Sequence, residues 1–161
     1  MKWDEVLVPD PRTGMFIGRY QHTIDPKGRV SIPARYRTAL AQYEGTLLVV
    51  PQDQCLNVYP FAAWERVVGA LNEQSQFDER LRRVGRLWIS RAREVELDGA
   101  GRILLPPDSR QQAGLVKDVT LVGLGREFFE IWDRKRFEEY ERANGDALGG
   151  DFAWLSQVGV K

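Results

Sequence analysis

DPKGRVSIP, at Asp25–Pro33, returns later in the chain as DGAGRILLP, at Asp98–Pro106. The offset of 73 positions, from 25 to 98, continues downstream, where Leu48-Val49 falls on Leu121-Val122. It continues to residues 64–65, and we expect the correspondence to run without a gap. One short turn can recur by chance, but a register kept over this length indicates an internal duplication.

Each copy predicts the same small β-rich unit. The Asp and Gly of each repeat supply hairpin chemistry, and we expect Gly28 and Gly101 to adopt positive φ. Pro33 and Pro106 end a strand and can open a short helix. The last strand of each copy alternates apolar and polar residues, which is typical of a half-buried strand. The expected strands are residues 20–24, 29–32, 46–50 and 56–59, then 93–97, 102–105, 119–123 and 129–132.

Apolar residues at intervals of three to four predict a helix after each copy and another between the copies. The stripe from Phe77 to Trp88 favours core or subunit packing over a cofactor site. Residues 144–150 are rich in glycine and predict a flexible segment, followed by an apolar patch at Phe152 and Trp154. The chain is therefore divided into an N-terminal extension (1–14), a first repeat with its helix (15–74), a linker helix (75–90), a second repeat with its helix (91–143) and a C-terminal tail (144–161).

The composition is that of a folded protein without an overall basic charge. Hydrophobic residues make up 43% of the 161 positions, and 23 basic side chains balance 23 acidic ones. Between residues 18 and 37, however, five basic side chains face one acid, Asp25. Such a cluster predicts a cationic face, although it is equally typical of a merely solvated surface.

Several functional classes are disfavoured by what the chain contains. A single cysteine, Cys55, excludes an internal disulfide, and a single histidine, His22, makes a metal site or a catalytic triad hard to build. There is no phosphate-binding loop, dinucleotide fingerprint, signal peptide or membrane-spanning apolar run. We therefore expect no enzyme activity, no metal, no cofactor, no small-molecule substrate and no membrane partner, and a cytoplasmic location.

The two turns carry the candidate functional residues. Each places a carboxylate before the turn and a guanidinium after it, so that the Asp can accept backbone N–H groups and hold the Arg in a fixed direction. An oriented Arg can contact phosphates or bind guanine O6 and N7 together, and a slender hairpin fits the major groove of DNA. We predict turn-structuring roles for Asp25, Gly28, Asp98 and Gly101, and DNA contact for Arg29, Lys27, Arg102, Arg19 and Arg35.

These roles have structural alternatives. Each Asp–Arg pair can serve the turn alone, and Lys27 can be a simple surface residue. The copies also differ, because Lys27 and Arg35 correspond to Ala100 and Asp108. We therefore hypothesise that the first hairpin dominates DNA affinity.

The repeats and their flanks resemble the MraZ family. The matching stretches are Met15–Gly18, the two Asp-x-x-x-Arg signatures, and Leu121–Leu124 leading into Phe129–Trp132. The resemblance covers about residues 15–142. It implies a mixed, β-rich α+β fold, in which two tandem SpoVT-AbrB-like units form a swapped-hairpin β-barrel with pseudo-two-fold symmetry and flanking helices.

The resemblance also implies a function. Members are transcriptional regulators that form ring-like homo-oligomers, associate with the nucleoid, and bind direct repeats in double-stranded DNA upstream of the division and cell-wall gene cluster. The alternative left open is an oligomeric AbrB-like interaction module or an antitoxin-type protein. Retention on DNA distinguishes these classes.

Overall fold

The strands form one large and one small antiparallel sheet. The computed structural model describes residues 14–43 and 45–160, so the predicted extension 1–14 lies almost wholly outside the described residues. The six-stranded sheet has the order β1 (Arg19–Thr23), β7 (Asp118–Gly123), β8 (Phe129–Asp133), β4 (Cys55–Pro60), β3 (Leu47–Gln52), β5 (Arg93–Val95). A separate ribbon pairs β2 (Arg29–Ser31) with β6 (Arg102–Leu104). Each strand that the sequence predicts is present, within a few residues of its expected bounds.

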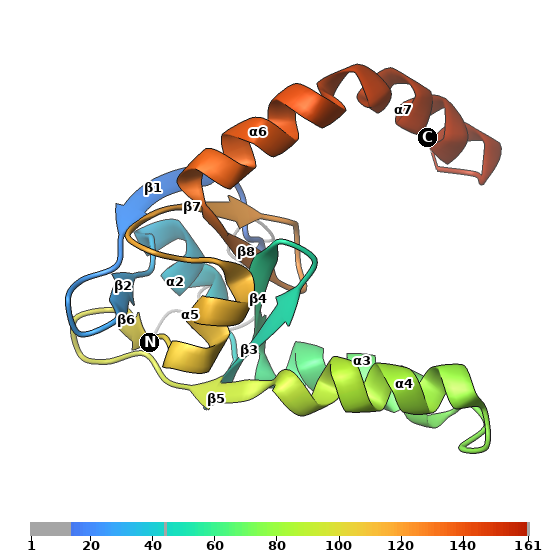
Figure 1. Ribbon diagram of the computed structural model, residues 1–161, viewed down its shortest axis with the longest axis horizontal. Helices are drawn as coiled ribbons and strands as arrows, with labels where there is room; N and C mark the ends of the chain where they lie inside the picture. The colour runs from blue at the N-terminus through green and yellow to red at the C-terminus, as the bar shows by residue number, and fades with distance from the viewer. Residues whose placement is uncertain (1–13, 44, 161) are drawn as a thin grey trace, which may run out of the picture.

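Two short helices lie among the strands, and the longer helices project from the sheet (Figure 1). Pro33 and Pro106 precede short helices, as expected, at α2 (Ala34–Leu40) and α5 (Pro107–Ala113). The predicted helices after the copies and between them are α3 (Phe61–Asn72), α6 (Arg134–Asn144) and α4 (Glu79–Leu87), with a short 3-10 turn, η2 (Ile89–Arg91), before β5. None of the described helices is both long and apolar enough to cross a bilayer.

The two copies complete each other's sheets. Strand β1 of the first copy pairs with β7 of the second, and β5 of the second pairs with β3 of the first. In the ribbon, the Ile32 N–H donates to the Gly101 carbonyl at 2.9 Å, and the Leu105 N–H donates to the Gly28 carbonyl at 2.9 Å. This reciprocity gives the chain its pseudo-two-fold symmetry.

The large sheet is open. Its end strands, β1 and β5, lie at opposite ends of the strand order, and no pairing joins them within the described part of the chain. A closed barrel, which the family resemblance implies, is therefore not seen. The mixed α+β class and the exchange between copies are present, while the small ribbon is a separate sheet that the Ile24–Val30 bridge joins to the chain just after β1.

The main core lies between the large sheet, the ribbon and helix α2. Phe16, Tyr36 and Phe129 are fully buried in it, and the ring of Tyr36 is 5.7 Å from Phe16 and 4.8 Å from Phe129. Burying an apolar side chain of this size contributes roughly 1.5–3 kcal/mol. Side chains from both copies meet here, so neither copy could bury this surface alone.

Strand β4 departs from the half-buried pattern that its alternation predicts. All six of its residues are buried. Leu56 and Val58 face the main core, while Tyr59 packs with Trp64 in a second cluster on the other side. The polar Asn57 is accommodated because its amide donates to Gln52 Oε1 at 2.8 Å. The prediction that this strand is half-buried is wrong, because β4 is a central strand covered on both faces.

The repeat is not free of gaps, contrary to expectation. Leu47 pairs with Pro60, and Val119 pairs with Asp133, although Pro60 and Asp133 are 73 positions apart. Within β7 the structural offset is therefore 72, from 47 to 119, and Leu121 takes the core-facing place of Val49. Because side chains alternate between faces, burial of one face determines the register of a strand. The missing position lies before β7 and is restored in the loop before β8.

The expected flexible tail is helical. After α6 the chain continues through a 3-10 turn, η3 (Gly145–Ala147), into α7 (Leu148–Gln157). Asn144, Ala147 and Leu148 all keep right-handed helical ψ values. Glycines such as Gly149 and Gly150 weaken a helix by about 1 kcal/mol each but do not prevent its backbone conformation. Figure 1 shows α6 and α7 as one bent arm that projects from the sheet.

Candidate nucleic-acid interface

The first turn is held together by one carboxylate. Asp25 Oδ1 accepts the backbone N–H groups of Lys27 and Arg29, both at 2.9 Å. Its other oxygen, Oδ2, accepts Arg29 Nε at 2.7 Å. Gly28 has φ +91°, a left-handed value that a side chain would resist. The turn therefore orients Arg29 through bonds within five consecutive residues.

The second turn repeats this geometry. Asp98 Oδ1 accepts the N–H groups of Ala100 and Arg102 at 2.9 Å, and Oδ2 accepts Arg102 Nε at 2.9 Å. Gly101 has φ +77°. The positive φ predicted for both glycines is confirmed. Both turns lie at the same end of the molecule, away from the projecting helices (Figure 1).

The two arginines remain partly accessible. Their side chains are 30% exposed for Arg29 and 32% exposed for Arg102. The contact with Asp uses Nε, and the Nη1 and Nη2 groups are further donors in the same plane. An arginine held this way can meet a phosphate or a guanine edge with little loss of side-chain freedom.

The carboxylates of both turns have pKa values below that of an ordinary aspartate. Backbone hydrogen bonds, chiefly the N–H of Arg29, hold the pKa of Asp25 below its ordinary value. The N–H of Arg102 does the same for the pKa of Asp98. Hydrogen bonds to the charged form favour ionisation, so each Asp–Arg pair persists at neutral pH.

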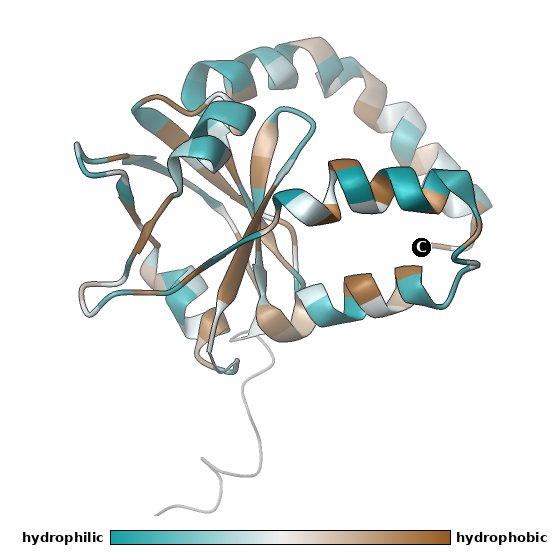
Figure 2. Ribbon diagram, turned by 60° about the horizontal axis from the view of Figure 1, so that its bottom comes forward, coloured by the Kyte–Doolittle hydropathy of each residue, from teal (hydrophilic) through white to brown (hydrophobic). Residues whose placement is uncertain are grey.

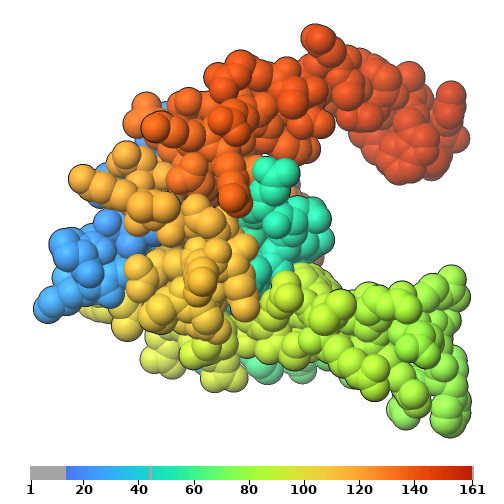
Figure 3. All heavy atoms as spheres, viewed as in Figure 1, coloured from blue at the N-terminus to red at the C-terminus, as the bar shows by residue number. Residues whose placement is uncertain are grey.

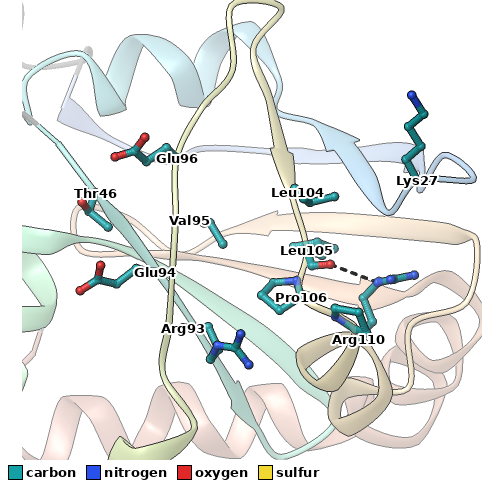
Figure 4. A pocket seen from close by; sticks show the side chains of 11 residues that line it. Lys27, Thr46, Arg93, Glu94, Val95, Glu96, Leu104, Leu105, Pro106 and Arg110 are labelled. Atoms are coloured by element: carbon teal, nitrogen blue, oxygen red, sulfur yellow. Dashed lines mark hydrogen bonds between the residues drawn. The ribbon is translucent and has the colours of Figure 1, made fainter.

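The other predicted contact residues lie in different places. Lys27 is exposed in the first turn, and its ammonium points away from neighbouring side chains (Figure 4). Arg35 lies in the first turn of α2 and is partly buried. Arg19 is bound to α6, where its Nη1 donates to Glu141 at 2.6 Å and its guanidinium lies 5.0 Å from the ring of Phe137. The structure thus brings Lys27, Arg29 and Arg102 together at the end of the molecule that carries the two turns, and holds Arg19 elsewhere.

Two further arginines, Arg37 and Arg110, connect the turns across the copies. A Cβ placed on Gly28 would lie 3.1 Å from Arg110 Cζ, and one placed on Gly101 would lie 2.6 Å from Arg37 Nη1. Each short helix therefore places its arginine against the other copy's turn. In the sequence, these two arginines could be singled out because they match each other at the repeat offset of 73.

A surface hollow of about 630 Å³ lies beside the first turn (Figure 4). Its lining mixes cations, Lys27, Arg93 and Arg110, with the carboxylates Glu94 and Glu96. Mixed charge does not specify an anionic ligand. Within residues 14–43 and 45–160, no group of three His, Cys, Asp or Glu could hold a metal ion.

Comparison with known proteins identifies the family. The family model described as "MraZ protein, putative antitoxin-like" matches residues 15–87 and 88–147. The chain belongs to the MraZ family. The MraZ model's two matched segments meet next to η2, consistent with the internal duplication.

Curated relatives carry the same family name. A protein named Transcriptional regulator MraZ from Thioalkalivibrio sulfidiphilus is 49% identical over 121 residues, which is 74% of this chain and 80% of the relative. Proteins of that name from a Marinomonas species and from Acetivibrio thermocellus are 41% and 39% identical, over 85% and 88% of this chain and 90% and 99% of theirs.

Proposed function

We propose that this MraZ-family chain is a sequence-specific DNA-binding transcriptional regulator and has no enzymatic activity. The observation that carries the proposal is the pair of Asp–Arg turns at one end of the molecule, with matching hydrogen bonds. The name of the relatives, Transcriptional regulator MraZ, supports it.

The turns suit a duplex in size and chemistry. A hairpin can enter the major groove, where Arg binds guanine O6 and N7 through two parallel hydrogen bonds. Arg29 and Arg102 would make such contacts or bind phosphates, and Lys27 would add a phosphate contact. Asp25 and Asp98 would position the arginines without touching DNA.

The first turn would contribute more affinity than the second. Lys27 is exposed beside Arg29, whereas the equivalent residue beside Arg102 is Ala100. Asp108, the counterpart of Arg35, is paired with Arg93 at 2.6 Å. These differences make the second turn less cationic.

The proposed targets are direct repeats upstream of the division and cell-wall gene cluster that includes the protein's own gene. A ring-like homo-oligomer would present several turn pairs to such repeats and gain about 10²–10⁴-fold by effective concentration. Repeats in one orientation suit a rotational assembly better than a two-fold dimer. The proposed location is the cytoplasm, in association with the nucleoid.

The test measures binding of the purified chain to a fluorescent fragment from upstream of its own gene, at low and moderate salt. Double replacement Arg29→Ala/Arg102→Ala is expected to abolish specific retention. Arg134→Ala, an exposed arginine on α6 paired with Glu138, is the matched control and is expected to bind normally. A folded wild type that assembles yet ignores the fragment in dilute buffer would reject the proposal and favour an interaction or antitoxin-type module.

A further inference from the structure

An aromatic pair recurs in the two copies. The rings of Tyr59 and Trp64 are 5.3 Å apart in the first copy. Their counterparts at the repeat offset, Trp132 and Phe137, are also 5.3 Å apart. Each pair joins the last strand of its copy to the following helix, so the duplication has produced two equivalent surfaces.

The first of these surfaces is covered by the linker. Trp88, just after α4, lies 5.3 Å from the ring of Trp64. Ile89 and Ala92 pack against the same cluster. The chain itself therefore supplies the side chains that cover the first aromatic pair.

The second surface is only partly covered. Arg19 lies over one side of Phe137, but a hollow of about 570 Å³ opens beside the pair, lined also by Val122, Leu124 and Tyr140. A second hollow, of about 280 Å³, lies on the α7 side of Tyr140 and reaches Leu148. Leu124, Tyr140 and Leu148 are 46%, 45% and 53% exposed; we call these three residues the acceptor surface.

Helix α4 and the turn before it present an exposed apolar face. None of the helix's residues is buried. While Trp88 faces α3, the side chains of Phe77, Val84 and Leu87 are 87%, 36% and 56% exposed; we call these three the donor surface. Figure 2 shows apolar residues, in brown, among the hydrophilic ones on the projecting helices. Exposed apolar clusters of this kind are typical of interaction sites.

Charge complementarity matches the two surfaces. The acceptor hollows are lined by four carboxylates, Asp53, Glu130, Glu141 and Asp151, and by one guanidinium, Arg19. Around the donor surface, α4 carries four arginines, at positions 80, 82, 83 and 86, against Glu79 and the capping Asp78. Complementary charge favours encounter and specifies the orientation of two surfaces.

The two surfaces cannot meet within one chain. The donor surface lies on the α3–α4 arm, and the acceptor surface lies on the α6–α7 arm and the loop after β7, with a wide recess between the two arms (Figure 3). We propose that the donor surface of one copy docks into the acceptor surface of the next. A contact between two different surfaces is heterologous and builds a ring or an open filament. The inference rests on the assembly in the proposed function and specifies which surfaces form it.

Two sets of variants test the contact by light scattering. Phe77→Asp/Leu87→Asp removes the donor surface, and Leu124→Asp/Leu148→Asp removes the acceptor surface without touching the aromatic pair. Each is expected to reduce the mass in solution to that of one chain, 18.5 kDa. Val116→Asp, at a residue that is 79% exposed outside both surfaces, is the control and should assemble like the wild type. Circular dichroism verifies folding, and Arg83→Glu/Arg86→Glu tests the donor side without changing apolar residues.

Mixing the two defective variants gives the decisive measurement. Each still has one intact surface, so an equal mixture is expected to form pairs of twice the single-chain mass and nothing larger. A mixture that stays single, or defective variants that retain the wild-type mass, would overturn the inference. DNA is absent from these measurements, so they succeed or fail independently of DNA binding, which Arg29→Ala/Arg102→Ala tests in chains with both surfaces intact.

Discussion

The side chain of Arg110 lies against Gly28, so that a Cβ added at Gly28 would come within 3.1 Å of its guanidinium carbon. Arg37 lies against Gly101 in the same way. Each turn is thus supported on one side by its own aspartate and on the other by an arginine from the other copy. The two turns are therefore coupled through the fold.

Replacing Gly101 by alanine is expected to destabilise the protein by about 1–2 kcal/mol, the usual strain of a side chain at left-handed φ. The new methyl would also displace Arg37. Gly99→Ala in the same turn is the control, because a Cβ there meets nothing within 4 Å. Urea unfolding midpoints compare the two, and equal midpoints would contradict this account of the turn.

Stability is expected to fall as Asp25 and Asp98 become protonated. Their pKa values are lowered in the folded state from an ordinary 3.8. Their contribution is therefore fully present above that value and is lost as pH falls through the lower, folded-state pKa. Urea unfolding between about pH 5 and about pH 2 should show a steeper loss for the wild type than for Asp25→Asn/Asp98→Asn. Parallel curves would mean that the carboxylates contribute nothing.

The cationic difference between the turns is expected to appear in the salt dependence of DNA binding. Each phosphate contact contributes about −0.9 to the slope of log affinity against log salt concentration. Lys27→Ala should make the slope shallower by about that amount, and Ala100→Lys should make it steeper. Fluorescence anisotropy over a salt series measures both. Unchanged slopes would place both residues away from the phosphates.

Arg29→Ala is expected to weaken DNA binding more than Arg102→Ala, because only the first turn carries Lys27 beside its arginine. Loss of one bidentate base contact costs about 1–3 kcal/mol. Titration of the same DNA fragment with each folded variant gives the comparison. A greater loss for Arg102→Ala would reject the proposed asymmetry.

The thiol of Cys55 is expected to resist modification in the folded protein. Burial raises its pKa, and the neighbouring Glu130 raises it further, so the reactive thiolate is scarce near neutral pH. A chromogenic thiol reagent should react slowly with native protein and rapidly in denaturant. Prompt reaction under native conditions would show that β4 opens more readily than its burial suggests.

Local structure in this chain follows from the sequence. The bonds from Asp25 to the N–H groups of Lys27 and Arg29 span only a few residues, so residue identity alone predicts them. The positive φ of Gly28 and the helix after Pro33 follow from equally short-range constraints. The duplication was visible because both copies use the same turn chemistry.

Packing between distant segments could not be predicted from the sequence. The alternation in β4 could not reveal that Trp64 and its neighbours cover the outer face of the strand. The one-residue shift at Val119 followed from burial in the core and not from sequence match. The pairing of Arg19 with Glu141 joins residues 122 positions apart, and no local pattern in the sequence encodes that distance.

By itself, then, the amino-acid sequence determined two equivalent turns, because backbone hydrogen bonds and steric limits act within a few residues. Only the tertiary structure decided that each turn rests against the other copy and that the large sheet stays open. It also decided that two exposed apolar surfaces, one surrounded by arginines and the other by carboxylates, lie apart from each other. Those outcomes depend on which distant segments bury each other's surface, and that choice is made by the whole chain at once.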